Sequence, residues 1–306
     1  MTEPSSPYSA TSETGQTFKR RGRWERMKIA LKKAPWSARL GMFVVFIYFF
    51  TAIFAPMIAP YGEAQVFPEP FAIWSAEHLL GTDQIGRDVF TRIIYGARNS
   101  MGIALVTTLL SFFIGGGLGL VAAIDRHWVD QGLSRMVDVL MAIPSLIFAL
   151  MLLSIFGSSA LNLILIIAVL DSTRVYRLTR AVAINVAVMD YVEVARLRGD
   201  GLGWIMRREI LPNIMPPLVA EFGIRFCFVF LMIAALSFLG VGIQPPTADW
   251  GSMVRENASL IQFAKYDLKA AITPLLPAGA IAVLTVAVNF IVDWFLHQTS
   301  GLRDGR

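Results

Sequence analysis

Six apolar runs, each about twenty residues long, constrain this chain more than any other feature of its sequence. A helix of that length crosses the hydrocarbon core of a bilayer, which is roughly 30 Å thick. The sequence therefore predicts an all-α membrane protein with six transmembrane helices. The predicted spans are about Leu40–Ala59, Met101–Ile124, Val137–Phe156, Ser159–Tyr176, Pro216–Ser237 and Ala271–Leu296.

Composition agrees with a membrane location. Of the 306 residues 55% are hydrophobic and 16% are charged, whereas a soluble domain usually carries about 25% charged residues. The one cysteine, Cys227, excludes an internal disulfide framework and a cysteine-rich metal site.

The distribution of Lys and Arg sets the predicted orientation. With the N-terminus inside, twenty of the 27 basic residues fall in cytoplasmic segments and six fall in outer loops. Cytoplasmic loops are enriched in Lys and Arg, so both termini are predicted to be cytoplasmic. Because the basic excess follows topology, no nucleic-acid partner is expected.

The predicted organisation follows from the spans. Residues 1–39 form a cytoplasmic tail, disordered and then basic, which has no signal-peptide h-region. An anchor helix at 40–59 and an outer loop at 60–100, with an interfacial helix over Gly81–Arg98, come next. The core is 101–296, with a cytoplasmic tail at 297–306. In the second long outer loop, 238–270, Trp250 is expected at the headgroup boundary.

Signatures of catalysis are missing from the sequence. It contains no G-x-x-x-x-G-K-[ST] phosphate-binding loop, no H-E-x-x-H and no G-x-S-x-G. His78, His127 and His297 lack the spacing of metal ligands. We therefore expect no catalytic residue and no metal site, and an intramembrane enzyme has little support.

The cytoplasmic segment Tyr191–Pro217 is unusually large and rich in arginine for a connector. Its pattern predicts a helix over Val192–Leu197, then a sharp turn that the freedom of glycine allows. A second short helix is expected over Trp204–Leu211, stopped or kinked by Pro212. From the residues alone, an interfacial connector and a docking element both stay open. The turn glycines are Gly199, Gly201 and Gly203.

Two features of the spans are candidates for gating or packing. Gly115 and Gly119 form a small-xxx-small pair that allows another helix to approach closely. Pro144 removes a backbone hydrogen bond from the third span and can kink it. For each feature, a fixed structural role and a contact that moves during gating both stay open.

Charges at membrane depth are candidates for function because burying them in lipid is costly. Glu221 and Arg225 are four residues apart, the spacing of a same-face ion pair. Asp171 and Arg174 are three apart and interrupt the fourth span. Structural pairing near the inner mouth and direct substrate contact both stay open. Neither pair extends into a proton relay, which disfavours a self-sufficient secondary carrier or channel.

A family resemblance makes the cytoplasmic segment specific. Glu193-Val194-Ala195, Gly199 and Ile210-Leu211-Pro212-Asn213 resemble the EAA motif of binding-protein-dependent ABC transporter permeases. In that family the short helix inserts into a cleft on the ATPase. The resemblance implies these ATPase-coupling residues: Glu193, Ala195, Arg196, Gly199, Leu211, Pro212 and Asn213.

Further motifs resemble the C-type subunit of dipeptide/oligopeptide permeases, and together they cover most of the chain after the first span. They include Leu80–Asp88, Asp138–Pro144, Leu236–Pro246 and Trp250-Gly251. The resemblance implies an anchor helix followed by a five-helix ABC-importer core. The outer motif residues it picks out are Gly81, Thr82, Asp83, Gly86, Arg87 and Asp88.

The resemblance also implies partners and a function. The chain would be half of the pathway of an ATP-driven importer in the bacterial inner membrane, surrounded by membrane lipid and not itself an enzyme. A homologous B-type permease subunit, two ATPase subunits and an extracytoplasmic solute-binding protein would complete it. ATP and Mg would be held by the ATPases, with no cofactor in this chain. The cargo would be a di- or oligopeptide, or alternatively a nickel complex, glutathione, an opine or an oligosaccharide.

Two single residues and the C-terminal ending depart from the family pattern. Glu209 stands where the family often has His, and Ala234 stands where it commonly carries Glu in the fifth span. The ending Gly301–Arg306 is also unlike the usual one. These departures leave open how the ATPase contact is tuned and what the pathway selects.

Overall fold

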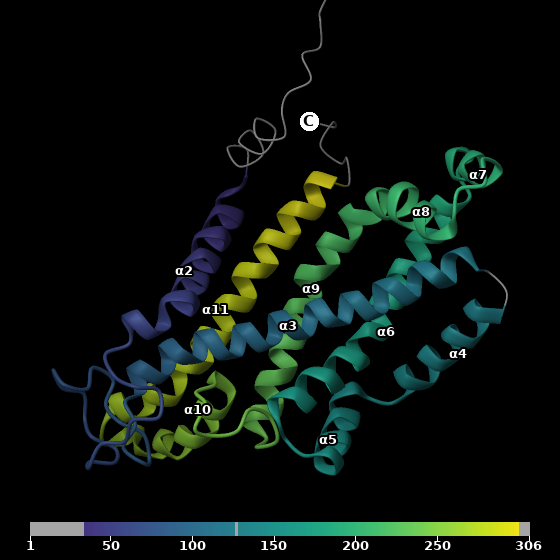
Figure 1. Ribbon diagram of the computed structural model, residues 1–306. Helices are drawn as coiled ribbons and strands as arrows, with labels where there is room; N and C mark the ends of the chain where they lie inside the picture. The colour runs from purple at the N-terminus through teal and green to yellow at the C-terminus, as the bar shows by residue number, and fades with distance from the viewer. Residues whose placement is uncertain (1–33, 126–127, 300–306) are drawn as a thin grey trace, which may run out of the picture. The chain divides into compact units, whose positions relative to one another are not determined.

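The computed structural model describes residues 34–125 and 128–299. The described residues from Trp36 onward belong to one compact unit. The regular secondary structure of the described residues is helical, with no β-strand among them (Figure 1). Most of the predicted N-terminal tail, His127 and the end of the predicted C-terminal tail lie outside them. The helices are α2 (Trp36–Ile58), α3 (Val89–Ile124), α4 (Trp128–Ala142), α5 (Ser145–Phe156), α6 (Ala160–Ala187), α7 (Asp190–Leu197), α8 (Leu202–Ile205), the π-helix η1 (Met206–Ile210), α9 (Leu211–Phe238), α10 (Trp250–Asn257), the 3₁₀-helix η2 (Ala258–Lys265) and α11 (Leu268–Thr299).

Four helices are long and apolar enough to cross a membrane, namely α2, α3, the continuous helix Leu202–Phe238 and Leu268–Gln298. A fifth crossing results if the bent pair α4 and α5 is counted as one. The predicted span Ser159–Tyr176 lies within α6, but three or more charged residues fall in every 18-residue stretch of this helix. By length and composition, the described residues thus support four or five of the six predicted spans.

The span predicted over Val137–Phe156 is not one continuous helix, and the kink expected at Pro144 is a complete break. Helix α4 ends at Ala142, α5 begins at Ser145, and the two are bent by 89°. Pro144 causes the break because it has no N–H to donate and disfavours helical angles at the residue before it. It instead acts as the N-cap residue of α5, and its carbonyl accepts a hydrogen bond from the Phe148 amide at 3.0 Å.

Helices α3 and α6 form the most intimate helix pair of the described residues. A Cβ added at Gly115 would lie 2.3 Å from the Ser172 carbonyl oxygen, and one at Gly119 would lie 2.8 Å from the Thr179 Cβ. Added carbons at Gly116 and Gly117 would meet nothing within 4 Å. The small-xxx-small pair is therefore the contact surface of α3 against α6.

A second packing centre is the side chain of Trp250, which is 2% exposed. Its ring makes edge contacts with Tyr48 of α2 and Phe230 of α9, with centroids 5.6 and 6.1 Å away. The indole N–H donates to the Ile93 carbonyl at 3.0 Å. The polar edge of the indole thus finds a protein partner inside the bundle, and the level of Trp250 at the headgroup boundary stays a prediction.

The anchor helix α2 packs against α11 and α3. Gly41 allows the contact with α11, since an added Cβ would lie 2.5 Å from the Ala287 carbonyl oxygen. Closer to the end of α2, the Tyr48 hydroxyl donates to the Ala280 carbonyl at 3.2 Å. One face of the anchor helix is thus fixed to the bundle at two levels.

The segment between α2 and α3 contains no helix, so the interfacial helix expected over Gly81–Arg98 is wrong for Gly81–Asp88. Gly81 and Gly86 adopt φ angles of 73° and 85°, a left-handed conformation that interrupts any helix. Helix α3 begins only at Val89, where the Asp88 carboxylate caps it by accepting from the Thr91 amide at 2.8 Å.

Candidate functional site

The short helix α7 lies at one end of the bundle, between α6 and α8 (Figure 1). Its inward face consists of Val192 and Ala195, both fully buried. They join an apolar cluster, here called the inner cluster, that draws on α3, α6, α7, α8, η1 and α9. Its fully or largely buried members are Ala123, Ala183, Ala187, Val192, Ala195, Ile205, Ile210, Ile214 and Leu218.

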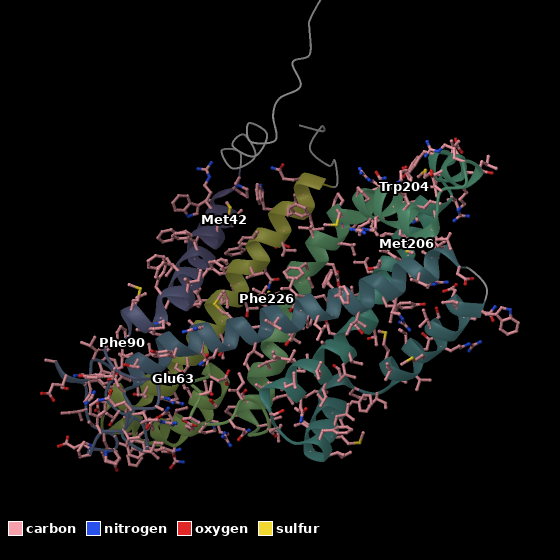
Figure 2. All side chains as sticks on the ribbon, viewed as in Figure 1. Met42, Glu63, Phe90, Trp204, Met206 and Phe226 are labelled. Atoms are coloured by element: carbon pink, nitrogen blue, oxygen red, sulfur yellow. The ribbon has the colours of Figure 1, made fainter. Side chains whose placement is uncertain are left out.

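The opposite face of α7 is open. Val194 is exposed, and Leu197 is 81% exposed. Glu193 and Arg196 are also exposed. Trp204, labelled in Figure 2, is half-exposed beside this face, with the Arg198 guanidinium 5.8 Å from its ring centroid. An apolar strip flanked by charges is therefore presented outward.

The turn after α7 depends on one glycine. Gly199 has φ of 82°, whereas Gly201 and Gly203 do not adopt positive φ, so only the first of the three predicted turn glycines supplies the special angle. An added Cβ at Gly199 would meet nothing within 4 Å, and its requirement is conformational rather than steric. The Asp200 amide closes the turn by donating to the Ala195 carbonyl at 3.1 Å.

Of the two outcomes predicted at Pro212, a stop or a kink, the stop is wrong, because no helix ends there. Helix α8 passes through the π-helical turn η1 directly into α9, so that Leu202–Phe238 is continuous. Pro212 is tolerated because it lies in the first turn of α9, after the π turn has already displaced the regular hydrogen bonds. The Asn213 side chain donates to the Glu209 carbonyl at 2.6 Å, while Leu211 packs on the inner cluster.

Within the predicted spans, the structure brings together Ser111, Asp171, Glu221 and Arg225, here called the mid-span cluster. The Arg225 guanidinium lies 2.7 Å from Glu221 and 3.5 Å from Asp171. Ser111 of α3 donates to the other Asp171 oxygen at 2.9 Å. The Glu221–Arg225 pair thus forms as its spacing indicates. Asp171 pairs across helices with Arg225 instead of with Arg174, which is exposed.

Two ion pairs that the sequence analysis missed join α4 to α6. Arg180 makes a two-pronged contact with Asp130, with its Nη2 2.6 Å from Oδ2. Arg177 lies 2.6 Å from Asp138, and both of these side chains are about half exposed. The partners are 50 and 39 residues apart in the chain, so no local spacing signals these pairs.

The residues of the outer motif form a turn in which the Asp83 carboxylate accepts three hydrogen bonds. Oδ1 of Asp83 accepts from the amides of Ile85 and Arg87 at 3.0 Å, and Oδ2 accepts from Arg87 Nε at 2.6 Å. The Thr82 hydroxyl donates to the Glu69 carbonyl at 2.7 Å. A Cβ at Gly81 or Gly86 would lie within 2.3 Å of a backbone oxygen.

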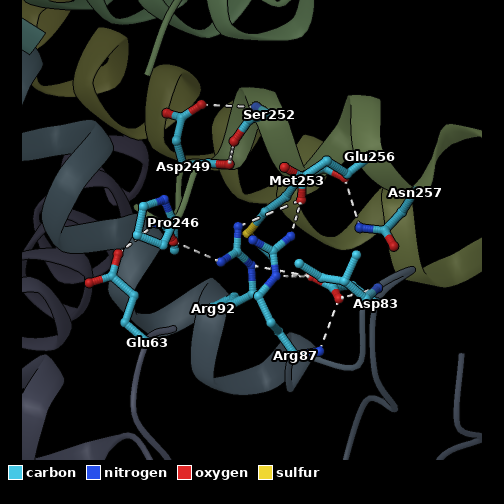
Figure 3. A network of polar contacts seen from close by, with 12 residues as sticks. Glu63, Asp83, Arg87, Arg92, Pro246, Asp249, Ser252, Met253, Glu256 and Asn257 are labelled. Carbon is cyan, nitrogen blue, oxygen red and sulfur yellow. Dashed lines mark hydrogen bonds and ion pairs between the residues drawn. The ribbon is translucent and has the colours of Figure 1, made fainter. Parts of the chain in front are cut away.

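That turn is joined to α10 by buried charges, shown in Figure 3. We call Asp83, Arg87, Arg92 and Glu256 the outer network. Arg87 Nη2 lies 2.6 Å from Glu256, and Arg92 lies 3.6 Å from both Asp83 and Glu256. The Arg92 Nη1 group donates to the Pro246 carbonyl at 3.2 Å. Sequence reasoning found Asp83 and Arg87 but missed Arg92 and Glu256, because the pairing with Glu256 spans 169 residues.

A second buried carboxylate, Asp249, starts α10 and ties it to α3. It accepts from the Ser252 amide at 2.9 Å as the N-cap and from the Ser100 hydroxyl at 2.8 Å. Burial raises the pKa of Asp249 above its ordinary value, and the hydrogen bonds from Ser252 and Ser100 oppose that rise. Nearby, Glu63 accepts from the Ala248 amide at 2.6 Å. Polar contacts thus hold α10 to α3 and to the segment around Glu63 at this end of the bundle.

No metal centre is evident in residues 34–125 and 128–299, where no three His, Cys, Asp or Glu side chains converge as ligands. The arrangement is that of a multi-pass membrane subunit. It has charges paired between helices and an exposed helix at one end.

The comparisons with known proteins define the family. Residues 115–298 match the family described as "Binding-protein-dependent transport system inner membrane component", and the chain belongs to that family. It is 32% identical to a dipeptide transport system permease of Alkalihalophilus pseudofirmus, over 99% of this chain and 93% of that one. It is 38% identical to the dipeptide permease DppC of Escherichia coli, over 87% of each chain.

A solved structure shares the fold. The MetNI methionine ABC transporter in an inward-facing conformation superposes with a TM-score of 0.51 at 17% sequence identity. The match covers 67% of this chain and 95% of the other chain. The chain is thus a permease subunit of an ABC importer in the bacterial inner membrane, and subunits of this family are not themselves enzymes.

Proposed function

We propose that this chain forms half of the pathway of an ATP-driven importer for di- or oligopeptides, and that the loop at Glu193–Asn213 couples it to a separate ATPase. The observation that carries the proposal is the two-faced character of α7. One face is open and partly apolar, and the other is locked into the inner cluster by Val192 and Ala195. A partner that grips the open face therefore pulls on α6 and α9 together.

The packing around α7 explains how a displacement of this helix would reach α6 and α9. Close-packed interiors transmit a displacement instead of absorbing it. Ala195 belongs to the inner cluster, which also contains Ala183 and Ala187 from α6 and Ile214 and Leu218 from α9. The ATP-bound state of the ATPases would favour one arrangement of these helices, and that differential affinity shifts the pathway between inward- and outward-open states.

The assembly we propose has six spans and both termini in the cytoplasm, as the Lys and Arg distribution indicates. A B-type permease subunit would complete the pathway, two ATPases would bind ATP and Mg, and a solute-binding protein would meet the outer loops at 60–100 and 238–270. Relatives named dipeptide permeases support a peptide cargo. Nickel complexes, glutathione, opines and oligosaccharides are the alternative cargoes.

The coupling proposal predicts that Gly199→Leu lowers dipeptide uptake roughly tenfold, because a left-handed conformation costs an L-residue about 1–2 kcal/mol. Glu193→Ala should likewise uncouple transport by removing an exposed contact. Uptake and ATP hydrolysis would be measured in vesicles that contain the reconstituted importer. Gly203→Ala is the matched control, since Gly203 is helical and an added Cβ meets nothing within 4 Å. Wild-type uptake in Gly199→Leu and in Glu193→Ala would refute the coupling role.

A further inference from the structure

An apolar groove of about 680 Å³ lies between the anchor helix α2 and the rest of the bundle. It is lined by α2, α3, α9 and α11, and Phe226, labelled in Figure 2, is one of its wall residues. Phe49 and Ile53 on α2 are 51% and 54% exposed, so the groove is open to the surroundings. None of the residues of the proposed ATPase contact, Glu193–Asn213, lines it.

The groove has one charged residue, Arg98, and every other lining side chain is apolar or glycine. Arg98 is exposed and makes no hydrogen bond or ion pair with any residue that the structure describes. By contrast, Arg87 and Arg92, a few residues earlier in the chain, both have carboxylate partners. A free guanidinium beside an apolar trough is therefore the feature to explain.

Helix polarity puts Arg98 at the outer end of the groove. Among the lining residues, Arg98 is nearest the start of α3 and Ile53 is nearest the end of α2. Those two helix ends are joined through the segment that carries the outer motif. On α11 the lining runs from Leu284 to Phe295, which at 1.5 Å per residue is about 16 Å of groove.

We propose that this groove binds one phospholipid of the surrounding bilayer, with an acyl chain along the apolar trough and the phosphate on Arg98. A bilayer offers acyl chains, as apolar as leucine, to any open apolar surface. An acyl chain lying along the trough would give its apolar lining many close dispersion contacts. The long arginine side chain can reach from the outer part of the groove toward the headgroup level, where a phosphate accepts its paired N–H groups.

The occupant would act as a further contact for the anchor helix. Helix α2 is fixed to α11 through Gly41 and Tyr48, while the side of α2 that bears Phe49 and Ile53 faces the groove toward α9. A lipid chain in the groove would contact both α2 and α9 and would thereby join them. The site thus supports the attachment of the anchor and is independent of the cargo.

Gly102 gives a direct test because it lines the groove and an added Cβ there meets nothing within 4 Å. Gly102→Leu should fill the trough and reduce the phospholipid retained by the purified importer about tenfold or more, counted by native mass spectrometry. Gly117→Leu is the matched control, since Gly117 also has open space, lies on the same helix and is outside the groove. Equal retention in both variants would overturn the proposal.

The headgroup contact is tested separately at Arg98. Arg98→Gln should weaken retention of phosphatidylglycerol added to nanodiscs about fivefold, the effect of one basic residue near a lipid surface, and Arg98→Lys should restore most of it. Retention that is unchanged in Arg98→Gln would contradict the phosphate contact.

Cross-linking distinguishes lipid from protein in the groove. A photoreactive benzoylphenylalanine in place of Phe49 should, in the assembled importer, form an adduct with phospholipid. An adduct with the partner permease would instead mean that a helix of the other subunit occupies the trough, and would overturn the lipid assignment.

Discussion

At the start of α3, two arginines that are almost fully buried share two carboxylates. Arg87 and Arg92 are 3% and 1% exposed, and Asp83 and Glu256 are their anionic partners. Burying four charges is tolerable only because the charges balance. Glu256 matters most for the fold, since it is the member that comes from α10 and links the outer turn to that helix.

Glu256→Gln should therefore destabilise the protein by about 3–5 kcal/mol, because it leaves an uncompensated buried positive charge. The measurement is the midpoint of thermal unfolding of the purified chain in detergent. Glu77→Gln is the control, as Glu77 is an exposed residue of the same outer segment. Matching midpoints for Glu256→Gln and the wild type would show that the charge balance is unimportant.

At the scale of helices, the close approach of α3 and α6 predicts a strong position dependence among neighbouring glycines. Gly115→Ala should destabilise the protein by about 1–3 kcal/mol, since its Cβ would overlap the Ser172 carbonyl and the two backbones would have to separate. Gly116→Ala adds the same methyl group into open space and should be nearly neutral. Thermal unfolding of both variants tests the contact, and equal losses would contradict it.

The sequence predicted those helices that are marked by apolar length or by helical spacing of their own residues. Apolar length located α2, α3, α9 and α11, and the helical spacing of Val192 and Ala195 located α7. Small residues at positions 115 and 119 marked the helix contact, whose partner α6 could not be named from the sequence. These features depend on neighbours within a few turns of the chain.

What the sequence did not predict depends on distant neighbours. Asp171 had a nearer partner in Arg174, yet packing brings Arg225 of α9 to it. Trp250 had the composition of an interfacial residue, yet Tyr48 and Phe230 enclose it. The extent of the bend at Pro144 is likewise tertiary, because a proline alone permits either a slight kink or a complete break.

At the scale of the whole molecule, α9 connects the regions described above. Its first turns belong to the inner cluster through Ile214 and Leu218, and its middle supplies Glu221 and Arg225. Its last turns contact α10, where the Ala234 carbonyl lies against Gly251. A displacement of α7 can thus reach the end of the bundle that holds α10 along one continuous helix, with the mid-span cluster halfway.

The mid-span cluster allows the structural and substrate-contact interpretations to be separated. Arg225→Gln leaves Asp171 and Glu221 without their shared cation, and losing one partner of a buried pair costs about 3–5 kcal/mol. If the cluster joins α6 to α9, uptake should fall by the same factor for acidic, neutral and basic dipeptides, and the protein should unfold at a lower temperature. Uptake of the three peptides would be measured in reconstituted vesicles.

Direct contact with cargo has a different signature in the same experiment. Removing a cation from the pathway would lower the uptake of acidic dipeptides most. Uptake of basic dipeptides would rise relative to uptake of neutral ones. Arg225→Lys provides the control, because it keeps the charge and loses the two-sided geometry with which guanidinium bridges two carboxylates. Since Arg225 is already held by Glu221 and Asp171 and is largely buried, we expect the uniform loss, and a cargo-dependent one would refute the structural role.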